Sequence, residues 1–245
     1  MKNRTALITG ASRGIGRAIA LRFAREGCDL FLTCRERGDL LREVQEQILE
    51  MDAGGDCRLF VGDLSEKGTA ERIFDQIGET GKTVDILINN AGIAHIGLFQ
   101  DTTWEEWQNI LSTNLTAVYA LCKEAIPAMI WNGQGKIVNI SSVWGVTGAS
   151  CEVAYSAAKG GLNALTQALA KELAPSNIQV NAIACGVIDT EMNHFLTPEE
   201  KTALMEEIPA GRMGTPEEVA ELAWQLASGH AYLTGQIIRL DGGWI

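Results

Sequence analysis

The chain of 245 residues lacks several features that mark particular classes of protein. None of its six cysteines stands in a C-x-x-C pair or in another metal-ligand spacing, so we predict no metal site. Its longest apolar runs are far too short to span a bilayer. No signal peptide precedes the first predicted strand. These absences predict a cytoplasmic protein with reduced thiols and no membrane contact.

Clustered positive charge is missing as well. The chain carries 20 Lys and Arg against 31 Asp and Glu, a formal net charge of −11. A surface that binds nucleic acid or an anionic membrane needs clustered Lys and Arg, so neither is an expected partner. The proportions of hydrophobic residues (46%) and charged residues (21%) are ordinary for a globular protein, and the length suits one α/β domain.

Apolar strand-like segments alternate with segments of helical periodicity along the whole chain. This alternation implies a parallel sheet covered by helices on both faces. We therefore predict an α/β fold, a single-domain doubly wound Rossmann fold with a seven-stranded parallel sheet over residues 1–245. The predicted strands are 6–9, 30–33, 59–61, 84–88, 136–140, 178–183 and 236–240, and the predicted helices are 14–26, 39–51, 104–130, 153–173, 197–207 and 216–227.

One long insertion interrupts this alternation at about 189–214, between a strand and a helix. Long loops in compact domains are often active-site lids. We therefore predict a substrate lid there.

A glycine-rich segment, Thr9-Gly10-Ala11-Ser12-Arg13-Gly14-Ile15-Gly16, joins the first strand to the first helix. Glycines allow a tight turn and close approach to a pyrophosphate, and the helix N-terminus offers free N–H groups and a positive dipole end. The spacing differs from the usual G-x-G-x-x-G, so a purely structural turn is the alternative. The position between a strand and a helix favours a dinucleotide site formed by Gly10, Ser12, Arg13, Gly14, Ile15 and Gly16.

The end of the second strand indicates which dinucleotide binds. An NAD site usually places Asp or Glu there for the ribose 2′-hydroxyl, whereas an NADP site places Arg. Here Cys34 stands at the acidic position and Arg35 follows it. Together with Arg13, Arg35 could clamp a 2′-phosphate, so we predict NADP(H) as the cofactor. The alternative is that Arg35 and Arg37 are surface charges paired with Glu36.

Tyr155 and Lys159 stand four residues apart near the start of the helix predicted at 153–173, so they share one face. A neighbouring ammonium is expected to lower the pKa of the phenol, which could then protonate a carbonyl oxygen near neutral pH. Ser142 ends the fifth strand, where α/β sheets place their ligands, and its hydroxyl can polarise the same carbonyl. Taken singly, the Tyr–Lys spacing is common on amphipathic helices and Ser142 could cap a turn.

The order of these motifs resembles that of the short-chain dehydrogenase/reductase family over nearly the whole chain. No single motif is specific, but the joint match in this order is. The remaining elements that carry the resemblance are Asp63-Leu64, Asn89-Asn90-Ala91-Gly92, Ser112-Thr113-Asn114-Leu115 and Tyr155-Ser156-Ala157-Ala158-Lys159.

The resemblance implies a role for each matching residue. The implied catalytic residues are Asn114, Ser142, Tyr155 and Lys159, with Asn114 holding a water that links Lys159 to solvent. Asp63 would bind the adenine, and Lys159 would also hold the nicotinamide ribose. Beyond the glycine loop, the implied cofactor contacts are Arg35, Asp63, Leu64, Asn90, Ala91, Gly92, Tyr155, Lys159, Ile188 and Thr190.

The C-terminal half is most similar to bacterial 3-oxoacyl-[acyl-carrier-protein] reductases, in segments 208–214, 216–220, 232–236 and 241–243. This similarity implies NADPH-dependent reduction of a 3-oxoacyl thioester in fatty acid biosynthesis. It also implies a homotetramer, with the two long helices and the seventh strand at its interfaces.

Two departures from the family pattern stand out. Cys185 occupies the usual position of a proline, and we expect the site to survive because proline only pre-sets a backbone angle. Reductases of acyl carrier protein also tend to carry two Arg that meet the acidic carrier. Asn132-Gly133 and Ser176-Asn177 stand at those positions here, so the docking Arg pair is absent.

These departures keep other functions open. The first alternative is a reductase or dehydrogenase of a small ketone, sugar or alcohol. A further alternative is a non-catalytic NADP-binding sensor or scaffold. The presence of all four implied catalytic residues argues against this alternative. Candidate residues of the substrate pocket are His95, Ile96, Val143, Trp144, Cys151, Glu152 and Met192.

Overall fold

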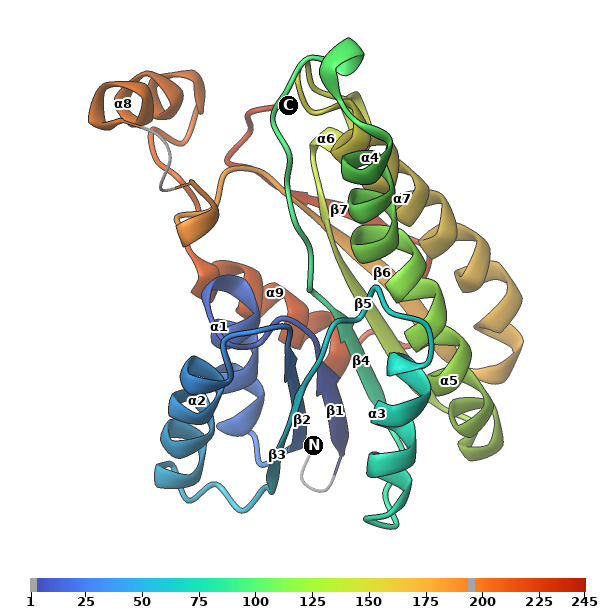
Figure 1. The fold of residues 1–245 in the computed structure, drawn as a ribbon. Helices are drawn as coiled ribbons and strands as arrows, with labels where there is room; N and C mark the ends of the chain where they lie inside the picture. Colours follow the sequence, from blue (N-terminus) through green and yellow to red (C-terminus); the bar gives the residue numbers. More distant parts are fainter. Residues whose placement is uncertain (1–3, 194–196) are drawn as a thin grey trace.

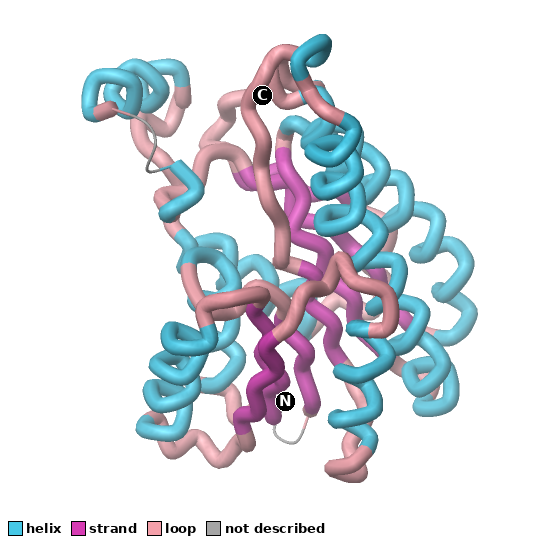
Figure 2. Tube along the Cα trace, in the orientation of Figure 1, coloured by secondary structure: helices cyan, strands magenta, loops and turns pink. Residues whose placement is uncertain are grey.

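The computed structural model describes residues 4–193 and 197–245, which form a seven-stranded parallel sheet between two layers of helices (Figures 1 and 2). The strand order is β3-β2-β1-β4-β5-β6-β7. The direction of winding reverses between β1 (Thr5–Ile8) and β4 (Ile86–Asn89). Open α/β sheets bind ligands at the carboxyl ends of the strands beside such a reversal. The predicted doubly wound α/β fold is confirmed.

The other elements follow in regular alternation. The remaining strands are β2 (Asp29–Cys34), β3 (Cys57–Val61), β5 (Gly135–Ser142), β6 (Ile178–Cys185) and β7 (Ile237–Leu240). The α-helices are α1 (Gly14–Ala24), α2 (Gly38–Glu50), α3 (Thr69–Gly78), α4 (Trp104–Leu111), α5 (Ala117–Asn132), α6 (Trp144–Thr147), α7 (Val153–Leu173), α8 (Pro198–Glu207) and α9 (Pro216–Ser228). Shorter elements are the 3₁₀ turns η1 (Phe99–Asp101), η3 (Ala174–Ser176) and η4 (Glu191–Asn193) and the π-helical segment η2 (Ser112–Thr116).

Two apolar clusters fill the space on either side of the sheet. Helices α1, α2 and α9 cover one face, and α3, α5 and α7 cover the other (Figure 1). Successive residues of a strand point to opposite faces, so Ile8 of β1 joins the first cluster and Leu7 joins the second. Both side chains are fully buried, as expected of a parallel sheet that is covered on both sides.

The helices differ from the predicted elements at three places, one of which is the short helix α6, which the sequence does not predict. α3 is missing from the elements that the sequence predicts, although Ala70, Ile73 and Ile77 recur at helical spacing and are buried. The single helix predicted at 104–130 is divided into α4 and α5 by the π-helical segment η2. Such segments insert a residue into the helix and frequently occur at functional sites.

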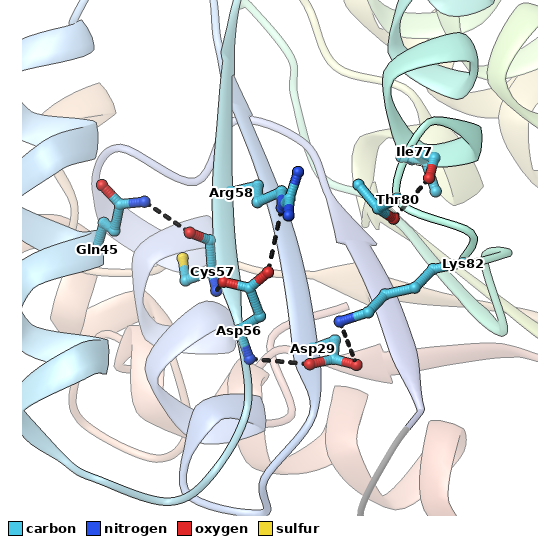
Figure 3. A network of polar contacts seen from close by, with 8 residues as sticks. All are labelled: Asp29, Gln45, Asp56, Cys57, Arg58, Ile77, Thr80 and Lys82. Atoms are coloured by element: carbon cyan, nitrogen blue, oxygen red, sulfur yellow. Dashed lines mark hydrogen bonds and ion pairs between the residues drawn. The ribbon is translucent and has the colours of Figure 1, made fainter.

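Polar contacts hold the edge strand β3 at the amino end of the sheet, far from the reversal site (Figure 3). Asp29 accepts a hydrogen bond from the Asp56 backbone N–H at 2.8 Å and forms an ion pair with Lys82 at 2.8 Å. Gln45 of α2 donates to the Cys57 carbonyl at 2.6 Å. These contacts join the loop before β3 and the loop before β4 to β2, and they join β3 to α2. The charged groups at this edge therefore have a structural role.

The predicted lid leaves and rejoins the body of the protein at one place. Gly214 N–H donates to the Val187 carbonyl, and Asp189 N–H donates to the Gly214 carbonyl, both at 2.9 Å. Figure 1 shows α8 standing apart from the sheet, and none of its residues is buried. Residues 194–196 of the predicted lid lie outside the described residues.

No helix in the described ranges is both long enough and apolar enough to cross a membrane. All six cysteines are free thiols. Cys151 is partly exposed, and the other five are buried.

Candidate active site at the carboxyl ends of the strands

The glycine loop leaves the N-terminus of α1 open. Arg13 is the N-cap residue, and no side chain among the described residues caps the helix there. In contrast, α4, α8 and α9 are each closed by a capping box with Thr103, Thr197 and Thr215 respectively. Uncapped backbone N–H groups together with the helix dipole form an anion site. The arrangement fits the pyrophosphate of a dinucleotide.

Asn90 holds this loop in place from the neighbouring strand. Its Nδ2 donates to the Thr9 carbonyl at 2.9 Å and to the Gly10 carbonyl at 3.2 Å. In return, Thr9 Oγ1 accepts from the backbone N–H groups of Asn90 and Ala91, both at 3.0 Å. Asn90 therefore shapes the loop itself, whatever it contacts in a cofactor. Thr9 is a site residue that sequence reasoning missed, and its place directly after β1 is the signal that could have found it.

Gly16 is required by this packing. A Cβ at this position would overlap the Gly10 carbonyl oxygen and lie 2.5 Å from Asn90 Nδ2. We expect Gly16→Ala to destabilise the fold by about 1–3 kcal/mol, as overpacking does, and to weaken dinucleotide binding. Gly78→Ala at the end of α3 is the control, because its Cβ would meet no atom within 4 Å. Chemical denaturation and calorimetric titration measure both effects; equal stability of the two variants would contradict the expectation.

The guanidinium groups predicted to hold a 2′-phosphate are engaged in ion pairs. Arg35 Nε lies 2.8 Å from Glu36 Oε1, and Arg13 Nη1 lies 3.1 Å from Glu191 Oε2. The Arg35 pair matches the alternative interpretation of surface charges. Both pairs are substantially exposed, and such pairs contribute only about 0–1 kcal/mol. A phosphate dianion can therefore compete for either Arg.

The predicted adenine contact follows β3. Asp63 Oδ1 accepts hydrogen bonds from the backbone N–H of Ser65 at 2.8 Å and from its hydroxyl at 2.7 Å, which fixes the carboxylate at the end of the strand. Leu64 packs against the apolar cluster beneath α3 and α5. The structure thus places Asp63 at the carboxyl edge of the sheet, with Leu64 turned inward.

Ile188 and Thr190, which the family resemblance implies as contacts of the nicotinamide end of the cofactor, lie beside the glycine loop. Ile188 is buried and forms an isolated β-bridge with Gly214. A Cβ on Gly14 would lie 3.3 Å from Thr190 Cγ2, so Thr190 packs directly against the loop. The base of the predicted lid and the N-terminus of α1 are therefore in contact.

Tyr155 and Ser142 come together from α7 and β5. The Ser142 hydroxyl lies near enough to the phenol to lower the pKa of Tyr155, against the larger rise that burial causes. Ser142 Oγ also accepts from the Trp144 backbone N–H at 3.2 Å, which fixes the serine side chain. A carbonyl oxygen placed between the two hydroxyls could accept a hydrogen bond from each.

Lys159 is buried one turn further along α7. Its Nζ donates to the Ile140 carbonyl at 2.8 Å and lies 5.7 Å from the centre of the Tyr155 ring. Burial lowers the pKa of Lys159 to about 8, so the amine is still mostly protonated at neutral pH.

The predicted lowering of the pKa of Tyr155 by Lys159 is wrong for this structure. Burial raises the pKa of Tyr155 above its ordinary value, and the Ser142 hydroxyl offsets only part of that rise. The physical reason is that loss of water disfavours the phenolate, while the Lys159 ammonium is directed at the Ile140 carbonyl. The phenol is therefore fully protonated at neutral pH, as a proton donor must be.

Asn114 lies in the π-helical segment beside Lys159. Its Oδ1 accepts from the Ile93 backbone N–H and its Nδ2 donates to the Ile93 carbonyl, both at 2.8 Å. A Cβ on Gly92 would lie 3.1 Å from Asn114 Oδ1 and 3.5 Å from Lys159 Nζ. The Asn114 amide and the Lys159 amine therefore both lie next to Gly92. An amide oxygen and an amide nitrogen can each make two hydrogen bonds, so the predicted water could still bind either end of the Asn114 side chain.

Buried polar contacts fix α7 against the sheet. Ser141 donates to Asn163 Oδ1 at 2.7 Å, and Asn163 Nδ2 donates to the Gly145 carbonyl at 2.9 Å. A Cβ on Gly145 would lie 2.7 Å from the Lys159 backbone, so only glycine permits this approach of α6 to α7. Sequence reasoning missed these supporting residues, because no local pattern marks them.

Cys185 lies opposite Ser142 in the β5–β6 register, where the family usually has proline. Val143 N–H donates to the Cys185 carbonyl at 3.0 Å, and Gly186 N–H donates to the Leu240 carbonyl at 2.9 Å. Burial raises the pKa of the Cys185 thiol to about 12, so it is neutral beside Lys159. The turn is anchored on both sides by backbone hydrogen bonds without proline, and survival of the site remains a prediction.

One wall of the site is acidic and aromatic. The Trp144 indole packs edge-on against Trp244, with ring centres 5.0 Å apart. Burial raises the pKa of the Glu152 carboxyl, and the Trp144 side chain offsets part of that rise. The carbonyl of Cys151, a residue in a left-handed conformation (φ 62°), accepts a hydrogen bond from the Gly97 N–H at 2.8 Å. This brings the segment after Gly92 against the start of α7. Trp244 was absent from the predicted pocket.

Comparison with known proteins agrees with this geometry. The profile of the family described as "Enoyl-(Acyl carrier protein) reductase" matches residues 10–245. An uncharacterized oxidoreductase of Bacillus subtilis, YmfI, is 40% identical over 243 residues, which cover 99% of each chain. The 3-oxoacyl-[acyl-carrier-protein] reductase FabG of Aquifex aeolicus is 40% identical over 244 residues, 99% of this chain and 98% of that protein.

Two solved structures share the fold closely. A putative gluconate dehydrogenase from Agrobacterium tumefaciens superposes with a TM-score of 0.93 at 35% identity, covering 99% of this chain and 96% of that one. YwfH, an NADPH-dependent reductase involved in bacilysin biosynthesis, superposes with a TM-score of 0.94 at 30% identity, covering 100% and 99%. The names of these similar proteins differ in substrate and agree on oxidoreductase chemistry.

Proposed function

Because the chain belongs to the short-chain dehydrogenase/reductase family, we propose that it is an NADPH-dependent reductase that converts a ketone carbonyl to an alcohol. One observation carries the proposal. The hydroxyls of Tyr155 and Ser142 meet beside buried Lys159, at the same edge of the sheet as the uncapped N-terminus of α1.

The described residues fit a nicotinamide dinucleotide. The N–H groups at the start of α1 would take the pyrophosphate, Asp63 the adenine, and Arg13 with Arg35 the 2′-phosphate. Lys159 would hold the nicotinamide ribose. When bound, the cofactor supplies the hydride that adds to the carbonyl carbon.

The chain itself handles the proton. Tyr155 is protonated at neutral pH and gives its proton to the carbonyl oxygen as that oxygen gains negative charge. Ser142 donates a hydrogen bond to the same oxygen and stabilises the developing charge. Lys159 would act through the nicotinamide ribose that it holds, and a water held by Asn114 would link Lys159 to solvent and return the proton.

The leading substrate is a 3-oxoacyl thioester carried by acyl carrier protein, as in fatty acid biosynthesis. Support comes from the FabG relatives, which are named as reductases of that substrate and match this chain over almost its full length. The product would be the 3-hydroxyacyl thioester.

The alternative substrate is a small ketone, a sugar or, in the reverse direction, an alcohol. The two expected docking positions for an acidic carrier lie together, since Asn177 Nδ2 donates to the Gly133 carbonyl at 3.1 Å, and both hold uncharged residues in place of Arg. With a net charge of −11, this surface matches an acidic protein poorly. One of the two similar solved structures is named as a putative gluconate dehydrogenase, so a protein of this fold is assigned a substrate that is not an acyl thioester.

Steady-state kinetics with carrier-linked, CoA-linked and free 3-oxo substrates, each with NADPH and NADH, test the proposal. We expect oxidation of NADPH with at least one 3-oxo thioester and a lower kcat/KM with NADH. Turnover of free ketones alone would favour the alternative substrate. No oxidation of either cofactor with any carbonyl substrate would favour a non-catalytic sensor or scaffold.

We also propose a homotetramer and a substrate lid at about 189–214. Exposed apolar side chains on α5, namely Tyr119, Ile130 and Trp131, favour a subunit interface, and β7 ends the sheet with an open edge. The molar mass in solution tests the assembly. The projecting position of α8 supports the lid.

A further inference from the structure

An acidic side chain from the predicted lid pairs with a guanidinium group that is predicted to hold the 2′-phosphate. Glu191 Oε2 is 3.1 Å from Arg13 Nη1, although the two residues are far apart in the sequence. Arg13 is the N-cap of α1 and belongs to the glycine loop. Figure 1 shows η4, which begins at Glu191 and is drawn in orange, beside the start of α1. The lid segment therefore contacts the cofactor loop through a carboxylate.

Glu191 also acts on a second cation of the same region. The pKa of Arg37, which follows the end of β2, is raised mainly by its hydrogen bond with Asp39, and the negative charge of Glu191 adds to that rise. Arg35 pairs with Glu36, its neighbour in sequence. The Glu191 carboxylate thus neutralises one of the two guanidinium groups predicted to hold a 2′-phosphate, and its charge also reaches Arg37.

The base of the lid restricts where Glu191 can move. Val187 and Asp189 are bonded to Gly214, and Thr190 packs against Gly14 of the loop. Glu191 directly follows this anchored base, and beyond it the segment projects as α8 without buried residues. The anchored backbone keeps Glu191 beside Arg13, while the exposed side chain can still turn away.

We propose that Glu191 is an internal competitor for the 2′-phosphate, and that it sets how strongly this protein distinguishes NADP(H) from NAD(H). The inference rests on the proposed use of NADPH. Without a dinucleotide the carboxylate neutralises Arg13. A 2′-phosphate carries more charge and can bind the guanidinium bidentately, so it displaces Glu191 at the cost of the ion pair. A ligand without this phosphate leaves the ion pair intact.

Calorimetric titration of the full chain with adenosine 2′,5′-bisphosphate and with AMP tests the competition without catalysis. Glu191→Gln keeps the size of the side chain and removes its charge. We expect this variant to bind the bisphosphate about two- to fivefold more tightly than the wild type, the range expected for an exposed ion pair. Binding of AMP is expected to be unchanged.

Glu206→Gln is the matched control, because Glu206 is exposed on α8 and its replacement removes the same charge from the same segment. This variant should bind both ligands as the wild type does. In an Arg13→Gln background, Glu191→Gln should give no further gain for the bisphosphate, because the competing pair is already gone.

Three results would overturn the inference. Unchanged affinity of Glu191→Gln for the bisphosphate would show no competition, and equal tightening of both ligands would show a general charge effect. A gain that persists without Arg13 would place the effect elsewhere. A separate result addresses the proposed cofactor: if wild type and Glu191→Gln both bind the bisphosphate no more tightly than AMP, the NADP assignment fails as well.

Discussion

Replacing Tyr155 by Phe is expected to lower kcat for carbonyl reduction by about 10²- to 10⁴-fold, the contribution of a positioned general acid. The substitution keeps the ring and removes the hydroxyl that lies near the Ser142 hydroxyl. The reaction would then lack the proton that the carbonyl oxygen needs. The fall of NADPH absorbance under saturating substrate measures kcat, and the melting temperature shows that the fold is retained.

Tyr232→Phe provides the control for this variant, because Tyr232 is fully exposed and lies far from α7 in the sequence. Its kcat should equal that of the wild type. If Tyr155→Phe kept more than one tenth of the wild-type kcat, the proton would have to come from another group, and the proposed role of Tyr155 would be wrong.

Replacing Lys159 by Met is expected to abolish most activity and yet stabilise the fold at pH 7 by about 2 kcal/mol. Burial shifts the pKa of Lys159 from 10.5 to about 8, and a shift of that size corresponds to a cost of about 3 kcal/mol for the charged form. Met has a similar shape without the charge. Loss of the hydrogen bond to Ile140 removes about 1 kcal/mol of the gain.

The pH dependence provides a second test of Lys159. Below pH 8 the amine is charged in the folded and the unfolded chain, so the full cost of burial is present. Between pH 8 and 10.5 the folded chain binds fewer protons than the unfolded chain, so wild-type stability rises with pH relative to the variant. The advantage of Lys159→Met should therefore be largest near pH 7, vanish near about pH 9.5 and become a deficit of about 1 kcal/mol by about pH 10.5, when only the lost hydrogen bond remains.

Urea denaturation of both proteins at pH 7 and pH 10 measures this difference. Lys171→Met, at an exposed position near the end of the same helix, is the control and should show no comparable dependence on pH. A Lys159→Met variant less stable than the wild type at pH 7 would show that the buried charge stabilises the fold, contrary to the expected cost of its burial.

The spacing of apolar residues was sufficient to predict a helix where one face of the helix is buried and its ends are marked in the sequence. The helix predicted at 153–173 is α7 without any change of bounds, and Leu162, Thr166 and Ala170 on its inner face recur at helical spacing. Helical periodicity by itself was therefore enough to assign Tyr155 and Lys159 to one face of a helix.

The spacing of apolar residues failed to predict α3 and η2, because contacts with the rest of the fold distinguish these elements and the local sequence does not. α3 has a polar outer face, and only the burial of Ile73 and Ile77 against the sheet reveals it as a layer of the fold. The single extra residue of η2 leaves the apolar pattern of 104–130 almost unchanged, so the sequence predicts one continuous helix. The engagement of Asn114 with Ile93 follows from that π-helical turn and has no local sign.

The sequence by itself determined the fold class and the identity of the reacting groups, because strand and helix periodicity and the order of the motifs are properties of the chain alone. Only the tertiary structure decided their electrostatic states. The pKa of Tyr155 is raised and that of Lys159 is lowered because desolvation depends on which groups pack around each side chain. The pairing of Arg13 with Glu191 likewise arises only because the fold brings the segment after Ile188 against the glycine loop.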